Sequence, residues 1–111
     1  MKFSCAKEVI LSAVQTTSKA AAGKSSIPAL EGVLMELEGN TLTVTGYDLE
    51  IGIKTSIEVN GIESGNIVIN ARMAGDIIRK MPSGDIIFEC GGNNIAEISG
   101  RDTNFSIMCM S

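Results

Sequence analysis

The stretch NTLTVTGYD, residues 40–48, has a counterpart in NIAEISGRD, residues 94–102. The two stretches lie 54 residues apart and share Asn, Gly and Asp at matching positions. Each one is a short run between turn-forming ends that is typical of a β-strand, and apolar and polar residues alternate in the first. A match at a fixed spacing indicates that the chain is built from two related halves.

Around the first stretch, the sequence predicts one strand, one helix and three further strands. Residues 2–6 alternate briefly, and residues 7–22 carry apolar side chains at helical spacing. Gly23 suits the end of that helix, and Pro28 favours an extended segment after it. The three strands are predicted at 33–38, 41–46 and 50–59, with the pair Gly39-Asn40 as the first hairpin turn.

The second half repeats this plan with a shorter connection after its helix. A strand is predicted at 66–71 and a helix at 72–81, which Pro82 ends. Strands follow at 85–90, 94–100 and 104–110. The first half holds an insertion of 11 residues, which centres on the loop at 23–32. We therefore expect one α+β domain over residues 1–111, with two βαβββ half-repeats and both helices packed on one face of antiparallel sheet.

The charge of the chain is unevenly distributed. Nine Lys and Arg against 13 Asp and Glu give a net charge of −4, which taken alone argues against nucleic-acid binding. The segments 7–24 and 72–81 nevertheless carry +2 each, and the rest of the chain carries −8. Helical geometry puts polar and basic side chains on the outer face of both helices, namely Ser12, Gln15, Thr16, Lys19, Arg72, Asp76, Arg79 and Lys80. Two interpretations stay open, a mildly basic binding surface or the ordinary solvated face of amphipathic helices.

The three cysteines, Cys5, Cys90 and Cys109, lie in strand-like apolar runs without metal-ligand spacing. Their odd number predicts buried free thiols in a reducing cytosol, and we expect neither a metal nor another cofactor. The N-terminal residues lack the apolar core of a signal peptide, and no run reaches the roughly 20 apolar residues of a membrane span. The sequence therefore predicts a cytoplasmic protein without membrane contact.

An enzymatic function has little support in the sequence. The chain has no histidine, which removes the commonest general base and metal ligand. Asp48-Leu49-Glu50 imitates a metal-binding pair but is more typical of a strand boundary. We expect a protein that is not an enzyme.

Four longer segments carry a resemblance to a known family. They are KFSCAKE (2–8), GKSSIPALEGVL (23–34), LTVTGYDLEIGI (42–53) and NARMAGDIIRKMP (70–82). In this order they resemble the first domain of the bacterial sliding clamp, the beta subunit of DNA polymerase III, and they cover nearly the whole chain.

The resemblance implies a ring of two chains joined head to tail, each with three similar domains, helices on the inner wall and sheet outside. Double-stranded DNA would pass through without sequence readout, and the ring would keep the replicative polymerase processive as a non-catalytic subunit. Polymerase and clamp loader would bind domains that this sequence does not contain. The implied DNA-facing residues are Lys24, Arg72, Arg79 and Lys80, to which the helix faces add Lys19 and Gln15.

The last strand, 104–110, has a separate implied role at the ring joint. In the family this edge pairs with the third domain of the partner chain. Phe105 and Ile107 share one face of the strand and suit apolar packing there, and Arg101 would add a charged contact. Three alternatives stay open: Phe105 and Ile107 as core of their own domain, Lys24 as a solvated loop lysine, and a protein-pairing module that uses the exposed edge without any DNA role.

Overall fold

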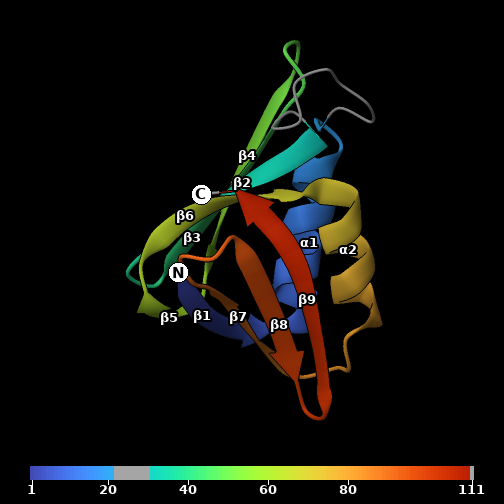
Figure 1. Ribbon diagram of the computed structural model, residues 1–111. Helices are drawn as coiled ribbons and strands as arrows, with labels where there is room; N and C mark the ends of the chain where they lie inside the picture. Colours follow the sequence, from blue (N-terminus) through green and yellow to red (C-terminus); the bar gives the residue numbers. More distant parts are fainter. Residues whose placement is uncertain (22–30, 111) are drawn as a thin grey trace.

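The structure, a computed structural model, describes residues 1–21 and 31–110 (Figure 1). The elements run in the order β1 (Lys2–Ala6), α1 (Lys7–Ser18), β2 (Gly32–Glu38), β3 (Thr41–Tyr47), β4 (Gly52–Glu58), β5 (Asn60–Glu63), β6 (Gly65–Asn70), α2 (Ala71–Lys80), β7 (Asp85–Cys90), β8 (Ile95–Gly100) and β9 (Thr103–Met110). The predicted α+β class is confirmed. Neither helix in the described ranges has the length and apolar character needed to cross a membrane.

The strands form one sheet in the order β4-β3-β2-β6-β9-β8-β7-β1-β5, and every pairing is antiparallel. The two halves exchange their first strands. β1 of the first half pairs with β7 of the second, and β6 of the second half pairs with β2 of the first. Each helix therefore follows a strand that belongs to the other half's part of the sheet, so the halves cannot separate without breaking both ladders.

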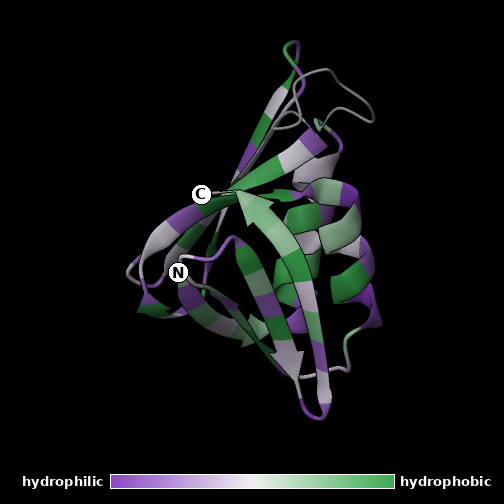
Figure 2. Ribbon diagram, viewed as in Figure 1, coloured by the Kyte–Doolittle hydropathy of each residue, from purple (hydrophilic) through white to green (hydrophobic). Residues whose placement is uncertain are grey.

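The two helices lie side by side on one face of this sheet (Figure 1). Along β7, β8 and β9, buried and more exposed residues alternate. Figure 2 shows hydrophobic and hydrophilic bands along β8, and the exposed positions of the three strands include the apolar residues Ile87, Ile95 and Met108. The buried side of the strands meets the apolar sides of both helices in one core. At its centre the rings of Phe3 and Phe88, on paired positions of β1 and β7, stack with centroids 5.3 Å apart.

The helix α1 ends at Ser18, four residues before the predicted end at residue 22. The hydroxyl of Thr17 donates to the carbonyl of Ala13 at 2.8 Å, and that of Ser18 donates to Val14. After Ser18 the backbone tightens, because Ala20 N donates to Thr17 O, three residues back. Hydroxyl groups that bond to the preceding turn, followed by such a tighter turn, are a usual way for a helix to finish.

The helix α2 begins one residue before the predicted start because Asn70 caps it. The Asn70 Oδ1 atom accepts a hydrogen bond from Met73 N at 2.9 Å. At the other end, Lys7 Nζ donates to the carbonyls of Arg79 and Met81 at 2.8 and 2.7 Å. A lysine at this end satisfies carbonyls that have no partner in the helix and opposes the negative end of its dipole.

The repeated stretches that predicted the two halves lie at matching places in the fold. Gly46 is the second-last residue of β3 and Gly100 the last of β8, and each lies close to the residues at the end of a helix. A Cβ atom on Gly46 would lie 2.1 Å from the carbonyl oxygen of Thr17 at the end of α1. One on Gly100 would lie 3.0 Å from the Cε atom of Met81, just after α2. The shared glycine thus allows each half to pack its helix end on its hairpin.

The strand β5 has no counterpart in the predicted plan, which continued the preceding strand to residue 59. Instead β4 ends at Glu58, and Val59 N donates to Asn40 O, which turns the chain toward β1. The side chain of Asn40 then accepts a hydrogen bond from Gly61 N at 2.9 Å. A short Asn-Gly segment lacks the alternation that marks a strand, so only the pairing with β1 defines it.

Candidate nucleic-acid interface

The candidate interface is the helix surface that faces away from the sheet. On and after α1 the exposed polar residues include Gln15, Thr16 and Lys19. On α2 they are Arg72, Arg79 and Lys80, and Asp76 is partly buried among them. Five of the six predicted DNA-facing residues are therefore exposed on this surface. The sixth, Lys24, lies outside the described residues.

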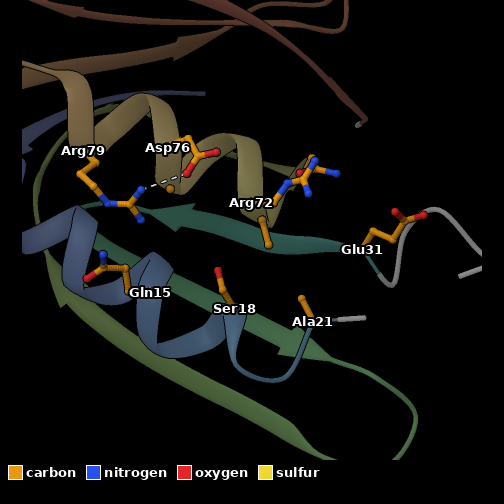
Figure 3. Close-up of a pocket in the computed structure, with 10 residues that line it drawn as sticks. Gln15, Ser18, Ala21, Glu31, Arg72, Asp76 and Arg79 are labelled. Carbon is orange, nitrogen blue, oxygen red and sulfur yellow. Dashed lines mark hydrogen bonds and ion pairs between the residues drawn. The ribbon is translucent and has the colours of Figure 1, made fainter. Parts of the chain in front are cut away.

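A hollow of about 520 Å³ runs between the two helices and brings several of these side chains together (Figure 3). Gln15 and Ser18 line it from α1, and Arg72, Asp76 and Arg79 line it from α2. Gly75 opens its floor, since a Cβ atom there would meet only the end of the Arg79 side chain, at 3.9 Å. Helical spacing predicted Gln15 and the two arginines on this surface. It did not identify the hollow, which depends on how closely α1 and α2 pack.

The two arginines of the hollow differ in their surroundings. Arg79 Nη1 donates to Asp76 Oδ1 at 2.9 Å, and both side chains are about half exposed, at 56% and 50%. An exposed pair of this kind contributes at most about 1 kcal/mol, so an anionic ligand can compete for Arg79. Arg72 points away from Asp76 (Figure 3), and within the described ranges it forms no ion pair.

The positive charge of Lys7 does not belong to the basic helix surface. Lys7 was counted with the charge of the first helix segment, but its ammonium group binds the carbonyls at the end of α2. The charge of Lys7 therefore supports the neighbouring helix and does not project from the outer face of α1. Lys19 and Lys80 remain exposed at the ends of their helices.

Acidic side chains lie on the opposite face of the sheet. In β2 the buried residues Val33, Met35 and Leu37 point toward the helices, so the alternating Glu36 points away from them. Glu89 of β7 and Glu97 of β8 are paired neighbours on this same outer face. The sign of the charge thus changes across the thickness of the domain.

The strand β9 contains the predicted ring-contact residues and leaves much of one edge unpaired. It pairs with β8 along residues 103–108, but with β6 only through Cys109 and Met110 among the described residues. Ile107 is 5% exposed and belongs to the domain's own core, and Phe105 packs against that core. Arg101 is exposed in the turn before β9. For the two apolar side chains, the structure therefore favours packing within the domain, and a ring contact stays a prediction.

The acidic turn at residues 48–50 has a structural role. Asp48 Oδ1 accepts hydrogen bonds from Glu50 N at 3.0 Å and from Ile51 N at 2.8 Å, closing the turn between β3 and β4. These backbone donors lower the pKa of Asp48 from its ordinary value of 3.8. Within residues 1–21 and 31–110, no three Cys, Asp or Glu side chains gather as a metal site would require.

The same architecture occurs in solved structures of DNA polymerase III beta subunits. One from Eubacterium rectale superimposes with a TM-score of 0.95 at 31% identity, covering 100% of this chain and 30% of the other. One from Pseudomonas aeruginosa gives a TM-score of 0.93 at 24% identity with the same coverage. The second likeness, at its lower identity, shows the fold alone.

The sequence of the chain matches the family described as DNA polymerase III beta subunit, N-terminal domain, over residues 1–111. A beta sliding clamp sequence from Vibrio harveyi is 32% identical over 109 residues, covering 96% of this chain and 74% of that sequence. A beta sliding clamp homolog from Streptomyces muensis, GriR, is 33% identical over 88 residues, which are 79% of this chain but 24% of GriR. Other relatives are likewise longer, so that the chain spans 35% of the Micrococcus luteus clamp and 29% of the Synechocystis clamp.

The fold and the sequence together define the class, a domain of a DNA polymerase subunit. The chain belongs to the DNA polymerase III beta subunit family and corresponds to its N-terminal domain.

Proposed function

We propose that this domain forms part of a sliding clamp, a closed ring around duplex DNA that keeps the replicative polymerase on its template. The domain would be the first of three in a full-length chain, and two such chains would close the ring head to tail. Its own part is non-catalytic. The helices supply the wall that faces DNA, and the strand edges join neighbouring domains.

The observation that carries this proposal is the separation of charge between the two faces. In the hollow between the helices, Arg72 and Arg79 are balanced by Glu31 and Asp76. The exposed Lys19 and Lys80 at the helix ends add the positive charge of this surface. The opposite face of the sheet presents Glu36, Glu89 and Glu97, and it also carries Lys2, beside Glu89, and Lys54. A polyanion is attracted to the first face and repelled by the second.

Weak contacts with phosphate groups suit this function better than strong ones. Cationic and amide side chains contact the backbone of DNA without reading its sequence. Each such contact is weakened by salt, with a screening length of about 8 Å at physiological ionic strength. A ring that is held by closure needs only contacts of this kind, which form and break as it slides. This explains how a domain with a net charge of −4 can act on DNA.

The test uses a three-domain chain that carries this domain, assembled on a closed circular duplex. We expect it to stay on the circle through gel filtration and to be lost once a restriction enzyme linearises the DNA, because a ring slides off a free end. Equal retention on circular and linear DNA would contradict the proposal. Blocking both ends of the linear DNA with bound protein should restore retention, which distinguishes sliding from dissociation.

A second candidate, a protein-pairing module without a DNA role, has support from the unpaired edge of β9. The helix surface discriminates between the two. If Arg72→Glu with Arg79→Glu leaves processive synthesis by the full-length protein unchanged, the helix surface has no DNA role and the pairing function stands alone. Lys54→Glu is the matched control, because Lys54 is exposed on β4 and Ile57, on the other face of that strand, packs against the core.

A further inference from the structure

Two of the three cysteines lie within bonding reach of each other in the described structure. The Sγ atoms of Cys90 and Cys109 are 2.8 Å apart, although the residues belong to β7 and β9, with β8 between those strands. Both residues are buried, at 6% and 7% exposed, and both are free thiols. A disulfide bond is about 2.05 Å long, so the two sulfur atoms need to approach by less than one ångström.

The backbone holds both residues in place at this end of the sheet. Cys90 N donates to Met1 O at 2.8 Å, and the Met1 ammonium group donates to Cys90 O at 2.9 Å. Cys109 N donates to Asn94 O at 3.0 Å. These hydrogen bonds hold the main chain of both residues, so the remaining approach of the sulfur atoms has to come from their side chains.

A path for a small reagent leads to one member of the pair. Cys109 is among the residues that line a surface hollow of about 220 Å³, together with Val68, Met108 and Met110. Burial, and next the neighbouring Cys90 thiol, raise the pKa of Cys109 to about 12. A protonated, nearly buried thiol reacts poorly with a bulky disulfide such as oxidised glutathione. The same raised pKa slows attack on peroxide, so oxidation at neutral pH is slow and becomes faster as the pH rises toward the pKa of Cys109. Among oxidants, a small uncharged one suits this site.

We infer that Cys90 and Cys109 are a redox modification site, at which hydrogen peroxide converts the two thiols into a reversible intrachain disulfide. The thiolate of Cys109, formed by loss of its proton, attacks one peroxide oxygen and becomes a sulfenic acid, and the departing hydroxide takes up a proton to leave as water. Cys90 then attacks that sulfur, forms the S–S bond and releases a second water. Two thiols and one peroxide thus give one disulfide and two waters, and a dithiol reductant restores the thiols.

The bond would join β7 directly to the end of β9, across β8. It would close a loop between residues that lie 19 apart in the sequence. Closing a loop of this size restricts the unfolded chain, so the oxidised protein should melt higher by on the order of 5–10 °C. The joined segment includes the part of β9 that pairs with β6. This inference does not depend on DNA binding or ring closure.

Cys5 supplies an internal control for the experiment. It lies on β1, half-buried, and burial is the main cause that raises its pKa to about 11. It is thus a second hindered thiol of the same chain, and among the described residues its sulfur has no hydrogen-bonded sulfur neighbour. If access to solvent decided which thiol peroxide oxidises, Cys5 would react before the buried pair. If the short distance between two sulfur atoms decides, Cys90 and Cys109 react first.

The experiment treats the folded protein with hydrogen peroxide, removes the excess, denatures it and alkylates the remaining thiols before peptide mapping. We expect Cys5 to be alkylated, and Cys90 and Cys109 to be recovered as one cross-linked peptide pair that has lost two hydrogen atoms. Dithiothreitol should return both peptides to the alkylatable form. Oxidation of the exposed Met108 adds oxygen to the same peptide and is therefore distinguished by mass.

Two variants complete the design. Cys5→Ala should leave the cross-link and the rise in melting temperature intact, and Cys109→Ala should abolish both. If Cys109→Ala does not fold, the mapping of the unsubstituted chain still decides. The inference is overturned if Cys90 and Cys109 stay alkylatable, if either one is recovered bound to Cys5 or to another chain, or if either one is oxidised only to a sulfinic acid.

Discussion

The side chain of Asp48 stabilises the turn between β3 and β4, and this stabilisation depends on pH. Its carboxylate accepts two backbone hydrogen bonds, so its pKa lies below 3.8 in the folded protein. A group with a lowered pKa stabilises the fold fully above its unfolded value, and this contribution is lost as the pH falls through the lower, folded value. We therefore expect Asp48→Ala to be less stable than the unsubstituted protein at pH 7, with a smaller difference near pH 3.

Urea unfolding at the two pH values measures this difference. Asp48→Asn is the control, because its amide oxygen can accept the same bonds but carries no charge to titrate. Its stability relative to Asp48→Ala should be nearly independent of pH. A gap between the unsubstituted protein and Asp48→Ala that stays constant from pH 7 to pH 3 would show that the charge on Asp48 has no part in the turn.

Among single residues, the sequence allowed the exposed polar positions of the helices to be predicted but not the partners of each side chain. Gln15, Arg72 and Arg79 follow from helical spacing, which fixes the face on which a residue lies. The position of Lys7 at the end of α2 depends on a contact between residues more than 70 positions apart in the chain. No local pattern contains such information.

At the scale of single elements, the helix end at residues 79–81 depends on Lys7. Removing its ammonium group in Lys7→Met keeps the aliphatic stem but leaves the carbonyls of Arg79 and Met81 without this donor. We expect a loss of about 1 kcal/mol in the free energy of unfolding. Hydrogen exchange should also become faster for the backbone amides in the last turn of α2.

The control for this change is Lys2→Met. Lys2 is separated from Glu89 by 3.9 Å, and both side chains are well exposed, so its removal should cost little. Equal losses of stability in the two variants would mean that the Lys7 hydrogen bonds contribute no more than an exposed ion pair.

The unpaired edge of β9 can be tested with a proline. Cys109 N donates toward β8, so the alternating Ser106 N points away from β8, toward the free edge. Ser106→Pro removes that donor without removing a backbone bond of the β8 ladder, and prolines are tolerated in this way on edge strands. It also removes the exposed hydrogen bond from Ser106 Oγ to Glu97 Oε1. We expect the full-length protein with Ser106→Pro to dissociate into single chains in analytical ultracentrifugation, while its domain stays folded by circular dichroism.

Ser56→Ala, a mild change on β4, is the control. It shows how much dissociation a substitution away from β9 causes in analytical ultracentrifugation. Ile107→Pro should unfold the domain, because the amide of Ile107 points toward β8 and its side chain is in the core. A fully dimeric Ser106→Pro protein would remove the edge of β9 from the proposed ring contact.

Most elements were predictable because their periodicity is local. Both helices and eight of the strands lie within a few residues of their predicted ranges. The differences arise where a tertiary contact decides: hydroxyl bonds end α1 at Ser18, Asn70 moves the start of α2 by one residue, and pairing with β1 defines β5. The internal repeat was the most useful feature for prediction, because both halves of the sequence predict the same order of strands and helix.

For the whole molecule, the repeat predicted two halves but not the exchange of their first strands. The sequence similarity between the halves is compatible with two arrangements. Each half could fold by itself, or the halves could exchange strands. The pairing of β1 with β7 and of β6 with β2 depends on long-range register, which no periodicity contains. The exchange brings α1 and α2 together on one face, and the candidate interface depends on that proximity.

The helix surface of the whole domain makes one further prediction, about salt. Each phosphate contact that a protein loses reduces the slope of log affinity against log salt by about 0.9. In the full-length protein, Arg72→Gln with Lys80→Gln should therefore weaken binding to a short duplex and flatten this slope, whatever the DNA sequence. Fluorescence anisotropy at several salt concentrations measures both quantities. Lys54→Gln removes an exposed positive charge from the opposite side of the sheet and should leave the slope unchanged. If Lys54→Gln flattens the slope as much as one of the helix substitutions, then net charge governs the interaction with DNA, and the arrangement of α1 and α2 does not.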